Sequence, residues 1–230
     1  MSKIVIYTAL FTDNIEEVFG TLPEYDIDNV EFICFTNTPH LKSNTWSIKL
    51  VDIKHNGRLS ARQYKMLPHL FLPEYDGWVW MDNSCLFKYH PIDLYNLYMD
   101  GYDISLHEHC DRTTIKQEAD LLVSRGHDVD IISKQILGYY NDGYQDQGLY
   151  ETGILMRKNN YQVIQFNEKW WTEISTKSVR DQLSFSYIKW LESNVKINGI
   201  KETFVAHNHQ LGKAQSEHFY TVPRQKVRLI

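Results

Sequence analysis

The most informative stretch of the chain reads Trp78-Val79-Trp80-Met81-Asp82-Asn83-Ser84. An apolar run rich in β-forming residues ends here in a carboxylate, an amide and a hydroxyl. A buried strand that ends in this way brings polar groups to the carboxyl edge of a sheet, where ligands bind in open α/β proteins. Asp82 can hold a divalent cation at that edge, and the cation can hold a diphosphate. The alternative interpretation is an Asp-Asn-Ser turn that follows a core strand.

The segments on either side of this stretch predict strands that alternate with helices. Apolar or alternating runs predict further strands at residues 4–11, 30–35, 46–53, 102–106, 151–157 and 203–206. Helical patterns cover residues 61–67 after a Ser60 cap and before Pro68, two segments between 112 and 140 broken near Gly126, and residues 161–174 and 179–191. This alternation predicts an α/β fold, a mostly parallel sheet with helices on both faces. We expect a single domain over residues 1–230.

Composition excludes several classes of protein. With 230 residues and 43% hydrophobic content, the chain is long enough to bury one substantial core. Its net charge of −5 argues against a broad nucleic-acid surface. The three cysteines form no Cys-x-x-Cys pair, which disfavours a thiolate zinc site and fits reduced thiols in the cytosol. The apolar run near Met1 is too short for a signal peptide, and none approaches the ~18 residues of a membrane span. We therefore expect a soluble, cytoplasmic protein.

A basic trio lies on the helix predicted after Ser60. Arg62 and Lys65 are three residues apart and share one helix face, with Arg58 just before them. Such a face can neutralise a diphosphate. The alternative is an ordinary solvated helix face.

Two segments of the second half carry further candidate groups. Residues 107–112, His-Glu-His-Cys-Asp-Arg, resemble a metal cluster, and in an extended chain His107, His109 and Asp111 would share one face. The alternative is a strand end followed by a helix cap at Asp111. Glu151 lies between two glycines in residues 148–153, and glycines permit close approach to a ligand. The alternative there is a loop that leads into a strand.

Two later motifs have both a structural and a chemical interpretation. Ser178-Val179-Arg180-Asp181 has the form of a capping motif before an apolar helix, yet a carboxylate at a helix start can also face a cleft as a catalytic base. His207-Asn208-His209 follows the last predicted strand and could complete a metal site with an Asp at the sheet edge. Otherwise these histidines belong to an exposed tail.

Several short motifs follow one another along the chain in a fixed order. They are Tyr7-Thr8-Ala9-Leu10-Phe11, Cys34-Phe35-Thr36-Asn37, Arg62-x-x-Lys65-x-x-Pro68-His69, Trp80-Met81-Asp82, His109-x-x-Arg112 with Glu118-Ala119, Gly148-Leu149-x-Glu151, Trp170-Trp171 and Ser178-x-Arg180-Asp181-Gln182-Leu183-Ser184-Phe185. In order and spacing they resemble the TOD1/MUCI70 glycosyltransferase-like domain. The resemblance covers roughly residues 4–190, and its most specific part is the Arg-Asp-Gln-Leu-Ser-Phe run.

The resemblance implies a GT-A-like, Rossmann-like glycosyltransferase that uses a nucleoside-diphosphate sugar. Residues 1–106 would form the nucleotide-sugar-binding half, and residues 107–230 the acceptor-side half with a C-terminal tail. Donor binding would involve Thr8 and Ala9 at the nucleoside, Arg58, Arg62 and Lys65 at base or phosphates, and Asp82 with Asn83. On the acceptor side, the resemblance implies His109, Arg112, Arg180 and Gln182.

The implied chemistry is sugar transfer to an acceptor hydroxyl, assisted by Mn²⁺ or Mg²⁺ held by Asp82, Ser84 and His207. In an inverting reaction Asp181 would be the general base, with Glu151 as second choice. The acceptor would be a glycan or another hydroxyl compound, and a nucleic-acid acceptor is disfavoured by the net charge. Two other functions stay open: a non-catalytic nucleotide-sugar or glycan binder, and a cation-dependent nucleotidyltransferase.

Overall fold

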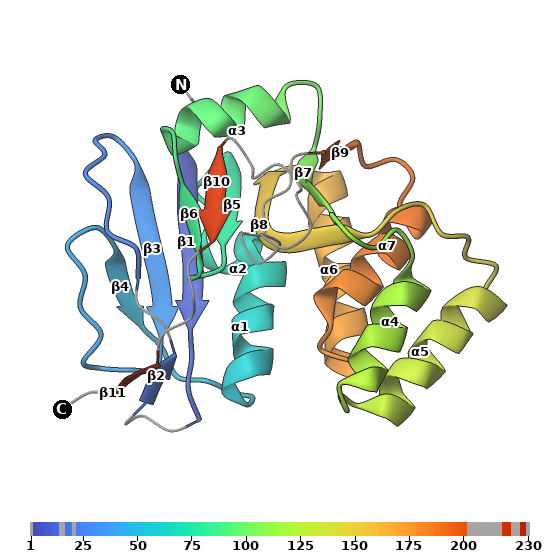
Figure 1. Ribbon diagram of the computed structural model, residues 1–230. Coiled ribbons are helices and arrows are strands. Elements are labelled where there is room, and N and C mark those ends of the chain that lie inside the picture. The colour runs from blue at the N-terminus through green and yellow to red at the C-terminus, as the bar shows by residue number, and fades with distance from the viewer. Residues whose placement is uncertain (1, 14–16, 20–21, 202–217, 222–225, 229–230) are drawn as a thin grey trace.

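The computed structural model describes residues 2–13, 17–19, 22–201, 218–221 and 226–228. Its centre is a seven-stranded sheet in the order β4-β3-β1-β5-β8-β7-β9 (Figure 1). The sheet strands are β1 (Ile4–Leu10), β3 (Glu31–Thr36), β4 (Ser47–Leu50), β5 (Gly77–Met81), β7 (Ile104–Glu108), β8 (Tyr150–Lys158) and β9 (Ile197–Ile200). Two short antiparallel pairs join β6 (Cys85–Phe87) to β10 (Phe219–Thr221) and β2 (Glu17–Phe19) to β11 (Lys226–Arg228).

The sheet is mostly parallel, with one strand reversed. Strands β4, β3, β1 and β5 run parallel to one another, and β7 runs parallel to β9. Strand β8 is antiparallel to both of its neighbours, β5 and β7. The predicted α/β class and mostly parallel sheet are therefore confirmed. Because β8 is reversed, its first residues lie at the same edge as the carboxyl ends of β5 and β7, which brings Glu151 to the edge where Asp82 lies.

The helices correspond closely to the predicted segments, but their caps differ. They are α1 (Gly57–Met66), α2 (Pro68–Phe71), α3 (Pro91–Met99), α4 (Ile115–Ser124), α5 (Val129–Asn141), α6 (Tyr161–Thr176) and α7 (Asp181–Leu191). The expected Ser60 cap is wrong, because Asn56 caps α1 by accepting a hydrogen bond from the amide of Leu59. The expected Asp111 cap is also wrong, because Thr114 caps α4 in a capping box. Helix α3 and strand β9 were not predicted.

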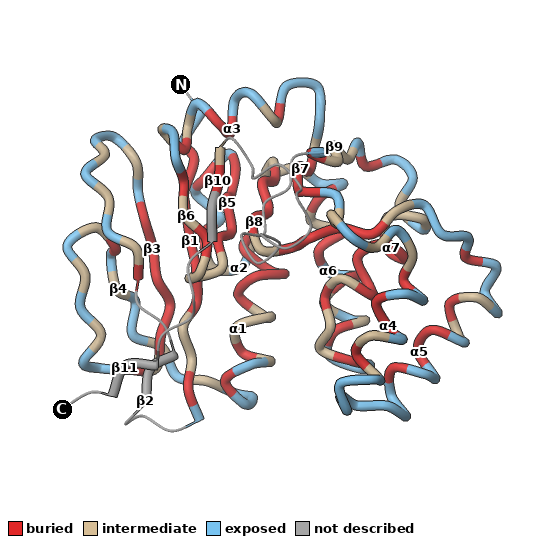
Figure 2. The backbone as a smooth tube through the Cα atoms, viewed as in Figure 1, coloured by how far each residue is buried: buried red, intermediate tan, exposed pale blue. Residues whose placement is uncertain are grey.

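Successive residues of β1 point into two separate cores, one on each face of the sheet. Val5 and Tyr7 belong to the core covered by α1, α2 and α4–α7, whereas Ile4 and Ile6 belong to the core on the α3 side. Figure 2 shows the strands as mostly buried backbone and the outer helix faces as exposed. Burial on both faces explains why β1 and β5 are apolar without alternation. The expected strand at residues 203–206 lies outside the described residues.

Helix α1 begins in close contact with the end of β1. The Gly57 amide donates to Asp13 Oδ1 at 2.7 Å. A Cβ at Gly57 would lie 3.0 Å from the backbone oxygen of Phe11, so only glycine allows this approach. The contact aligns α1 beside β1 and α6 (Figure 1). The last turn of α1 is thereby directed toward the start of α7.

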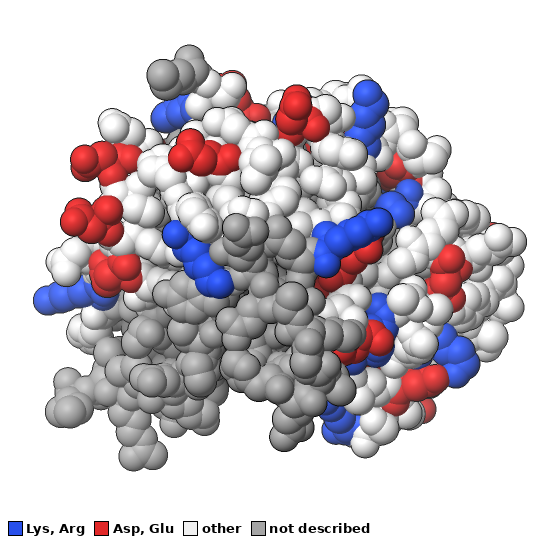
Figure 3. Space-filling view, turned by 45° about the horizontal axis from the view of Figure 1, so that its top comes forward, with Lys and Arg blue, Asp and Glu red and all other residues white. Residues whose placement is uncertain are grey.

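Within the described residues, no helix is both long enough and apolar enough to cross a membrane. On the face drawn in Figure 3, basic and acidic side chains of the described part are interspersed rather than gathered into one broad basic patch.

Candidate active site

Three elements that are distant in sequence bring charged side chains together at the carboxyl edge of the sheet. Lys65 lies in the last turn of α1, Asp82 directly follows β5, and Asp181 is the first residue of α7. The Lys65 Nζ lies 2.7 Å from Asp181 Oδ2 and 3.7 Å from Asp82 Oδ1. Lys65 is fully buried, so its ammonium group is an internal counter-charge to both carboxylates.

Asp181 is the most heavily paired carboxylate of this cluster. Besides Lys65, it has the Arg62 guanidinium at 3.4 Å and a hydrogen bond of 2.9 Å from the Thr152 hydroxyl. Burial by itself raises the pKa of Asp181, but the charges of Arg62 and Lys65 and hydrogen bonds from Lys65 and Thr152 outweigh it and hold the pKa well below its usual range. Asp181 therefore stays ionised near neutral pH and is a weak proton acceptor.

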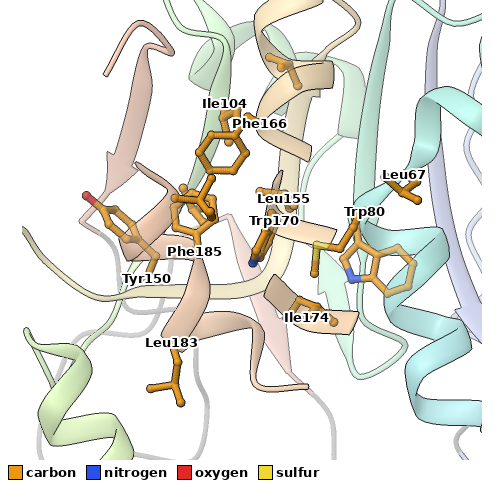
Figure 4. Close-up of a cluster of buried hydrophobic side chains, with 14 of the residues drawn as sticks. Leu67, Trp80, Ile104, Tyr150, Leu155, Phe166, Trp170, Ile174, Leu183 and Phe185 are labelled. Atoms are coloured by element: carbon orange, nitrogen blue, oxygen red, sulfur yellow. The ribbon is translucent and has the colours of Figure 1, made fainter. Parts of the chain in front are cut away.

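Helix α7 begins where it does because its first turn is anchored to α6. The Trp170 indole N–H donates to the Ser184 hydroxyl at 3.0 Å and approaches the Asp181 carbonyl at 3.3 Å. Trp170 and Phe185 lie side by side, with ring centroids 5.0 Å apart (Figure 4). The predicted Ser178 capping motif is wrong, because no side chain caps α7 at Arg180. The Ser178 hydroxyl instead donates a hydrogen bond of 2.6 Å to the side-chain amide oxygen of Gln135.

Asp82 forms the turn that its sequence context predicted as the alternative to a cation site. Its carbonyl accepts a hydrogen bond of 2.8 Å from the amide of Cys85, which closes a turn over Asn83 and Ser84. Its side-chain Oδ1 accepts a hydrogen bond of 2.8 Å from the indole N–H of Trp80. Its amide donates to Gly153 of β8 at 2.7 Å. The turn is therefore real, and it holds the carboxylate at the edge of the sheet.

The described groups around Asp82 do not fit the divalent cation that the resemblance implies. The Lys65 ammonium lies 3.7 Å from Oδ1, and that oxygen already accepts a hydrogen bond from Trp80. A cation bound there would be repelled by the buried ammonium group. Ser84 offers only a neutral hydroxyl, and His207 lies outside the described residues. Among the groups that can be described, the strong oxygen ligands here are Asp82 and Asp181, and the Lys65 ammonium is in contact with both.

Three arginines lie near Asp181: Arg62 contacts its carboxylate at 3.4 Å, and the charges of Arg62, Arg180 and Asp181 act on Arg58. Arg62 and Arg58 come from α1, and Arg180 immediately precedes α7. Partial burial of the guanidinium and the like charges of Arg180 and Arg62 lower the pKa of Arg58. The Nε atoms of Arg62 and Arg180 are buried and have no hydrogen-bond partner within the described chain. Buried donors without partners are uncommon in folded proteins, and these two lie beside the charged cluster, whereas the unpartnered Nε of Arg157 lies in the core.

Glu151 is a buried carboxylate in a different environment. Its side chain is buried at the start of β8, and its Oε2 has no hydrogen-bond partner within the described part. Desolvation raises the pKa of Glu151 to about 7, although hydrogen bonds from Cys110 oppose the shift. The pairing of β7 with β8 shifts register between Leu106 and His107, next to the pair that His107 forms with Glu151. Bulges of this kind are frequent beside active sites.

Glu151 is close in the chain to groups that hold the main cluster. The next residue, Thr152, binds Asp181, and the carbonyl of Gly153 accepts from the amide of Asp82. Glu151 is therefore a carboxyl group that changes charge near neutral pH. The two residues that follow it in the chain contact Asp181 and Asp82.

His109 and Arg112 form a second, adjoining cluster. Arg112 Nε donates to the buried Glu118 at 2.6 Å, and another Arg112 nitrogen lies 2.6 Å from His109 Nε2. Ligand atoms of His109, Cys110 and Asp111 lie within 4.8 Å of one another. A metal ion would have to displace Arg112, because His109 Nδ1 also accepts from the amides of Asp111 and Arg112. We therefore assign no metal to this cluster.

The remaining predicted residues are placed as follows. Thr8 and Ala9 are both buried within β1, and Ala9 is part of the hydrophobic core. Gln182, in the first turn of α7, is half-buried beside Asp181. The assignment of Thr8 and Ala9 to the nucleoside and of Gln182 to the acceptor stays a prediction.

The sequence analysis missed two residues that build the site. Thr152 donates to Asp181, and Trp170 anchors the turn that carries it. Thr152 directly follows Glu151 in the glycine-flanked segment, and Trp170 belongs to a Trp-Trp pair already noted in the ordered motifs. Both were therefore visible in the sequence, but their role depends on contacts between β8, α6 and α7.

Comparison with known families identifies one matching family. Residues 29–208 match the model of the TOD1/MUCI70, glycosyltransferase-like domain, which is well over half of the chain. The matched region contains α1, β5, β8 and α7, the elements that contribute the charged cluster. No curated protein matches the chain.

Proposed function

Because this chain belongs to the TOD1/MUCI70 glycosyltransferase-like family, we propose that it transfers a sugar from a nucleoside-diphosphate sugar to an acceptor hydroxyl. The proposal extends to a GT-A-type arrangement, in which the donor lies at the carboxyl edge of the parallel strands. Ligands of open α/β sheets bind outside this edge. Asp82, Lys65 and Asp181 meet there.

The excess of guanidinium groups at this edge carries the proposal. Four cationic side chains gather near two carboxylates: Lys65 contacts Asp82 and Asp181, Arg62 contacts Asp181, and the charges of Arg62 and Arg180 act on Arg58. Lys65 is buried between those carboxylates. Arg62 is shared with Asp181, and within the described residues Nε of Arg62 and of Arg180 is buried without a hydrogen-bond partner, so we propose that these groups also bind an external anion. Guanidinium groups bind phosphate oxygens through paired hydrogen bonds, so a diphosphate suits this cluster.

In the proposed reaction, Glu151 is the base that accepts the acceptor proton. The acceptor oxygen forms a bond to the anomeric carbon as the bond from that carbon to the diphosphate oxygen breaks. The guanidinium groups stabilise the negative charge that develops on the leaving diphosphate. We assign the base to Glu151 rather than to Asp181, since a pKa of about 7 suits proton transfer near neutrality. Asp181 would keep Lys65 and Arg62 in position.

Direct binding measurements test the donor site. Uridine, guanosine, adenosine and cytidine diphosphates are titrated into the protein by calorimetry, and at least one is expected to bind. Arg62→Gln and Arg180→Gln should each weaken that binding by about 10-fold or more, because each removes a phosphate-facing charge. Lys116→Gln is the matched control, since Lys116 forms an exposed ion pair with Asp120 on α4.

Absence of binding by all four diphosphates would contradict the proposal. An equal loss in the Lys116→Gln control would show that net charge alone matters. Turnover with diphosphate sugars then separates an enzyme from a non-catalytic binder, because only the enzyme releases the diphosphate. A nucleotidyltransferase would instead release pyrophosphate from a nucleoside triphosphate. The sugar acceptor and a cytoplasmic location are part of this proposal.

A further inference from the structure

The position of the Lys65 ammonium bears on how the diphosphate is held. Its Nζ is 2.7 Å from Asp181 and 3.7 Å from Asp82, and it lies 5.5 Å from the centre of the Trp80 ring. The side chain is fully buried, so this charge cannot move away into water. A cationic group therefore already lies between the two carboxylates nearest to the sheet edge.

We infer that the chain binds its nucleotide-sugar donor without a divalent cation, because the Lys65 ammonium replaces the cation between Asp82 and Asp181 while Arg58, Arg62 and Arg180 hold the diphosphate. This inference rests on the proposed function and departs from the cation-assisted reaction that the resemblance implies. Lys65 acts as a positioning residue, since it is buried, and the arginines contact the donor.

The charges of the cluster support this division of roles. A divalent cation at Asp82 would share Oδ1 with the Trp80 N–H and with an ammonium group 3.7 Å away. The Asp181 carboxylate likewise already has partners, since Lys65, Arg62 and Thr152 all contact it. Both carboxylates are thus already paired with a cationic group that a metal would have to displace. The guanidinium groups, in contrast, outnumber their carboxylate partner, so the cluster can neutralise a diphosphate by itself.

Backbone contacts hold Lys65 in this place. Its carbonyl accepts hydrogen bonds from the Tyr7 hydroxyl at 3.0 Å and from the Arg157 guanidinium at 2.6 Å. Arg157 and Tyr7 are both fully buried, and Arg157 also donates to Asn167 at 2.7 Å. The end of α1 is thus tied to β1 and β8, which directs the Lys65 side chain toward the start of α7.

The test compares donor affinity with and without divalent cations. Calorimetry measures the affinity of the best-binding nucleoside diphosphate, first in EDTA and then in Mn²⁺. We expect the two dissociation constants to agree within about twofold, a difference too small to indicate a bound metal. Electron paramagnetic resonance of free Mn²⁺ should show no signal loss with the protein alone, and with protein and diphosphate together no loss beyond that caused by the diphosphate alone.

Two outcomes overturn the inference, and they are distinguishable. Binding that occurs only with Mn²⁺, with stoichiometric loss of the free Mn²⁺ signal, contradicts this inference and leaves the proposed function intact. Absence of binding in both conditions contradicts the proposed function as well, and the inference fails with it.

A variant of Lys65 adds an independent measurement. Lys65→Met removes the charge and keeps the length, which leaves Asp82 and Asp181 without their shared cation. We expect the Lys65→Met variant to bind Mn²⁺ and so to lower the free Mn²⁺ signal, which the unchanged protein does not do. Lys65→Arg keeps the charge and should leave the signal unchanged. A folded Lys65→Met variant that ignores Mn²⁺ would contradict the claim that the ammonium excludes the cation. If Lys65→Met does not fold, the two measurements on the unchanged protein still decide.

Discussion

Glu151 and Asp181 are two buried carboxylates whose surroundings shift their pKa values in opposite directions. Desolvation raises the pKa of Glu151, whereas cationic partners hold the pKa of Asp181 below its usual range despite burial. Such divergent pairs are typical of sites in which one carboxyl group transfers a proton and the other stays charged. The sequence analysis named Asp181 as first choice for the base and Glu151 as second; the direction of the two pKa shifts leads us to propose the opposite order.

The role of Glu151 predicts a pH-dependent rate. A base must be deprotonated to act, so kcat/KM should rise with pH and level off above a pH of about 7. Glu151→Gln should lower kcat by roughly 10²–10⁴-fold and remove this rise. Steady-state kinetics from pH 5 to 9 measure both. Glu108→Gln, at the exposed end of β7, is the control and should keep the rise. A Glu151→Gln profile that still rises through pH 7 would assign the base to another group.

The role of Asp181 predicts a stability effect. Asp181→Asn leaves the buried Lys65 ammonium without its closest partner and should lower the free energy of unfolding by roughly 3–5 kcal/mol. Asp120→Asn breaks an exposed i,i+4 pair with Lys116 and should cost at most about 1 kcal/mol. Urea unfolding of both variants gives the comparison. Equal effects would mean that the buried network contributes no more than a surface ion pair.

At the scale of elements, α1 depends on a close approach that only glycine permits. The position where a Gly57 Cβ would lie is 3.0 Å from the Phe11 oxygen and 3.1 Å from its carbonyl carbon, both backbone atoms. The same helix carries Arg58, Arg62 and Lys65 and contacts β1 and α6. A shift at its first turn therefore displaces the charged side chains along its length.

Two glycine substitutions test this contact. Gly57→Ala should destabilise the protein, because the backbone of Phe11 must move to make room for the new methyl group. Gly138 lies inside α5, and a Cβ there meets nothing within 4 Å. Gly138→Ala should therefore stabilise by up to about 1 kcal/mol through helix propensity and a less flexible unfolded chain. Thermal unfolding compares the two. A Gly57→Ala variant at least as stable as the unchanged protein would contradict the close-approach argument.

At the scale of the whole molecule, one sheet joins the two halves that the sequence analysis separated. Strands β1, β3, β4 and β5 come from the first 106 residues and β8 and β9 from the remainder, yet all belong to one sheet, in which β5 pairs with β8. The charged cluster takes Lys65 and Asp82 from the first half and Asp181 from the second. Its pairing energy is therefore available only when the complete sheet has formed, which couples the site to global stability.

Burial of Glu151 in the folded molecule predicts a pH dependence of folding stability. The pKa of Glu151 is raised in the folded protein, from 4.5 to about 7. A raised pKa contributes stability that is fully present below pH 4.5 and is lost as pH rises through 7. Across that window, the unfolding free energy of the unchanged protein relative to Glu151→Gln should fall by up to roughly 3 kcal/mol. Urea unfolding at pH 4.5, 6 and 8 measures it. A constant difference would mean that Glu151 is not desolvated in the folded state.

The sequence by itself determined the α/β class, the positions of most strands and the family. Local patterns were sufficient because β1 and β5 are buried on both faces and read as continuous apolar runs, while helices such as α6 show their own periodicity. The ordered motifs identified the family because each motif is short and local. The candidate residues Lys65, Asp82 and Asp181 were found in the same way, each as a feature of its own segment.

Only the tertiary structure decided which of these residues meet and what their charges do. Helix caps were mispredicted at Ser60, Asp111 and Ser178, because several residues near each helix start can cap it and packing selects one. The reversal of β8 and the pairing of Lys65 with two carboxylates depend on contacts between residues far apart in the chain. A pKa is set by burial and by nearby charges, and neither is written in the local sequence. The physical reason is that side-chain identity is local, whereas the electrostatic environment of a side chain belongs to the folded molecule.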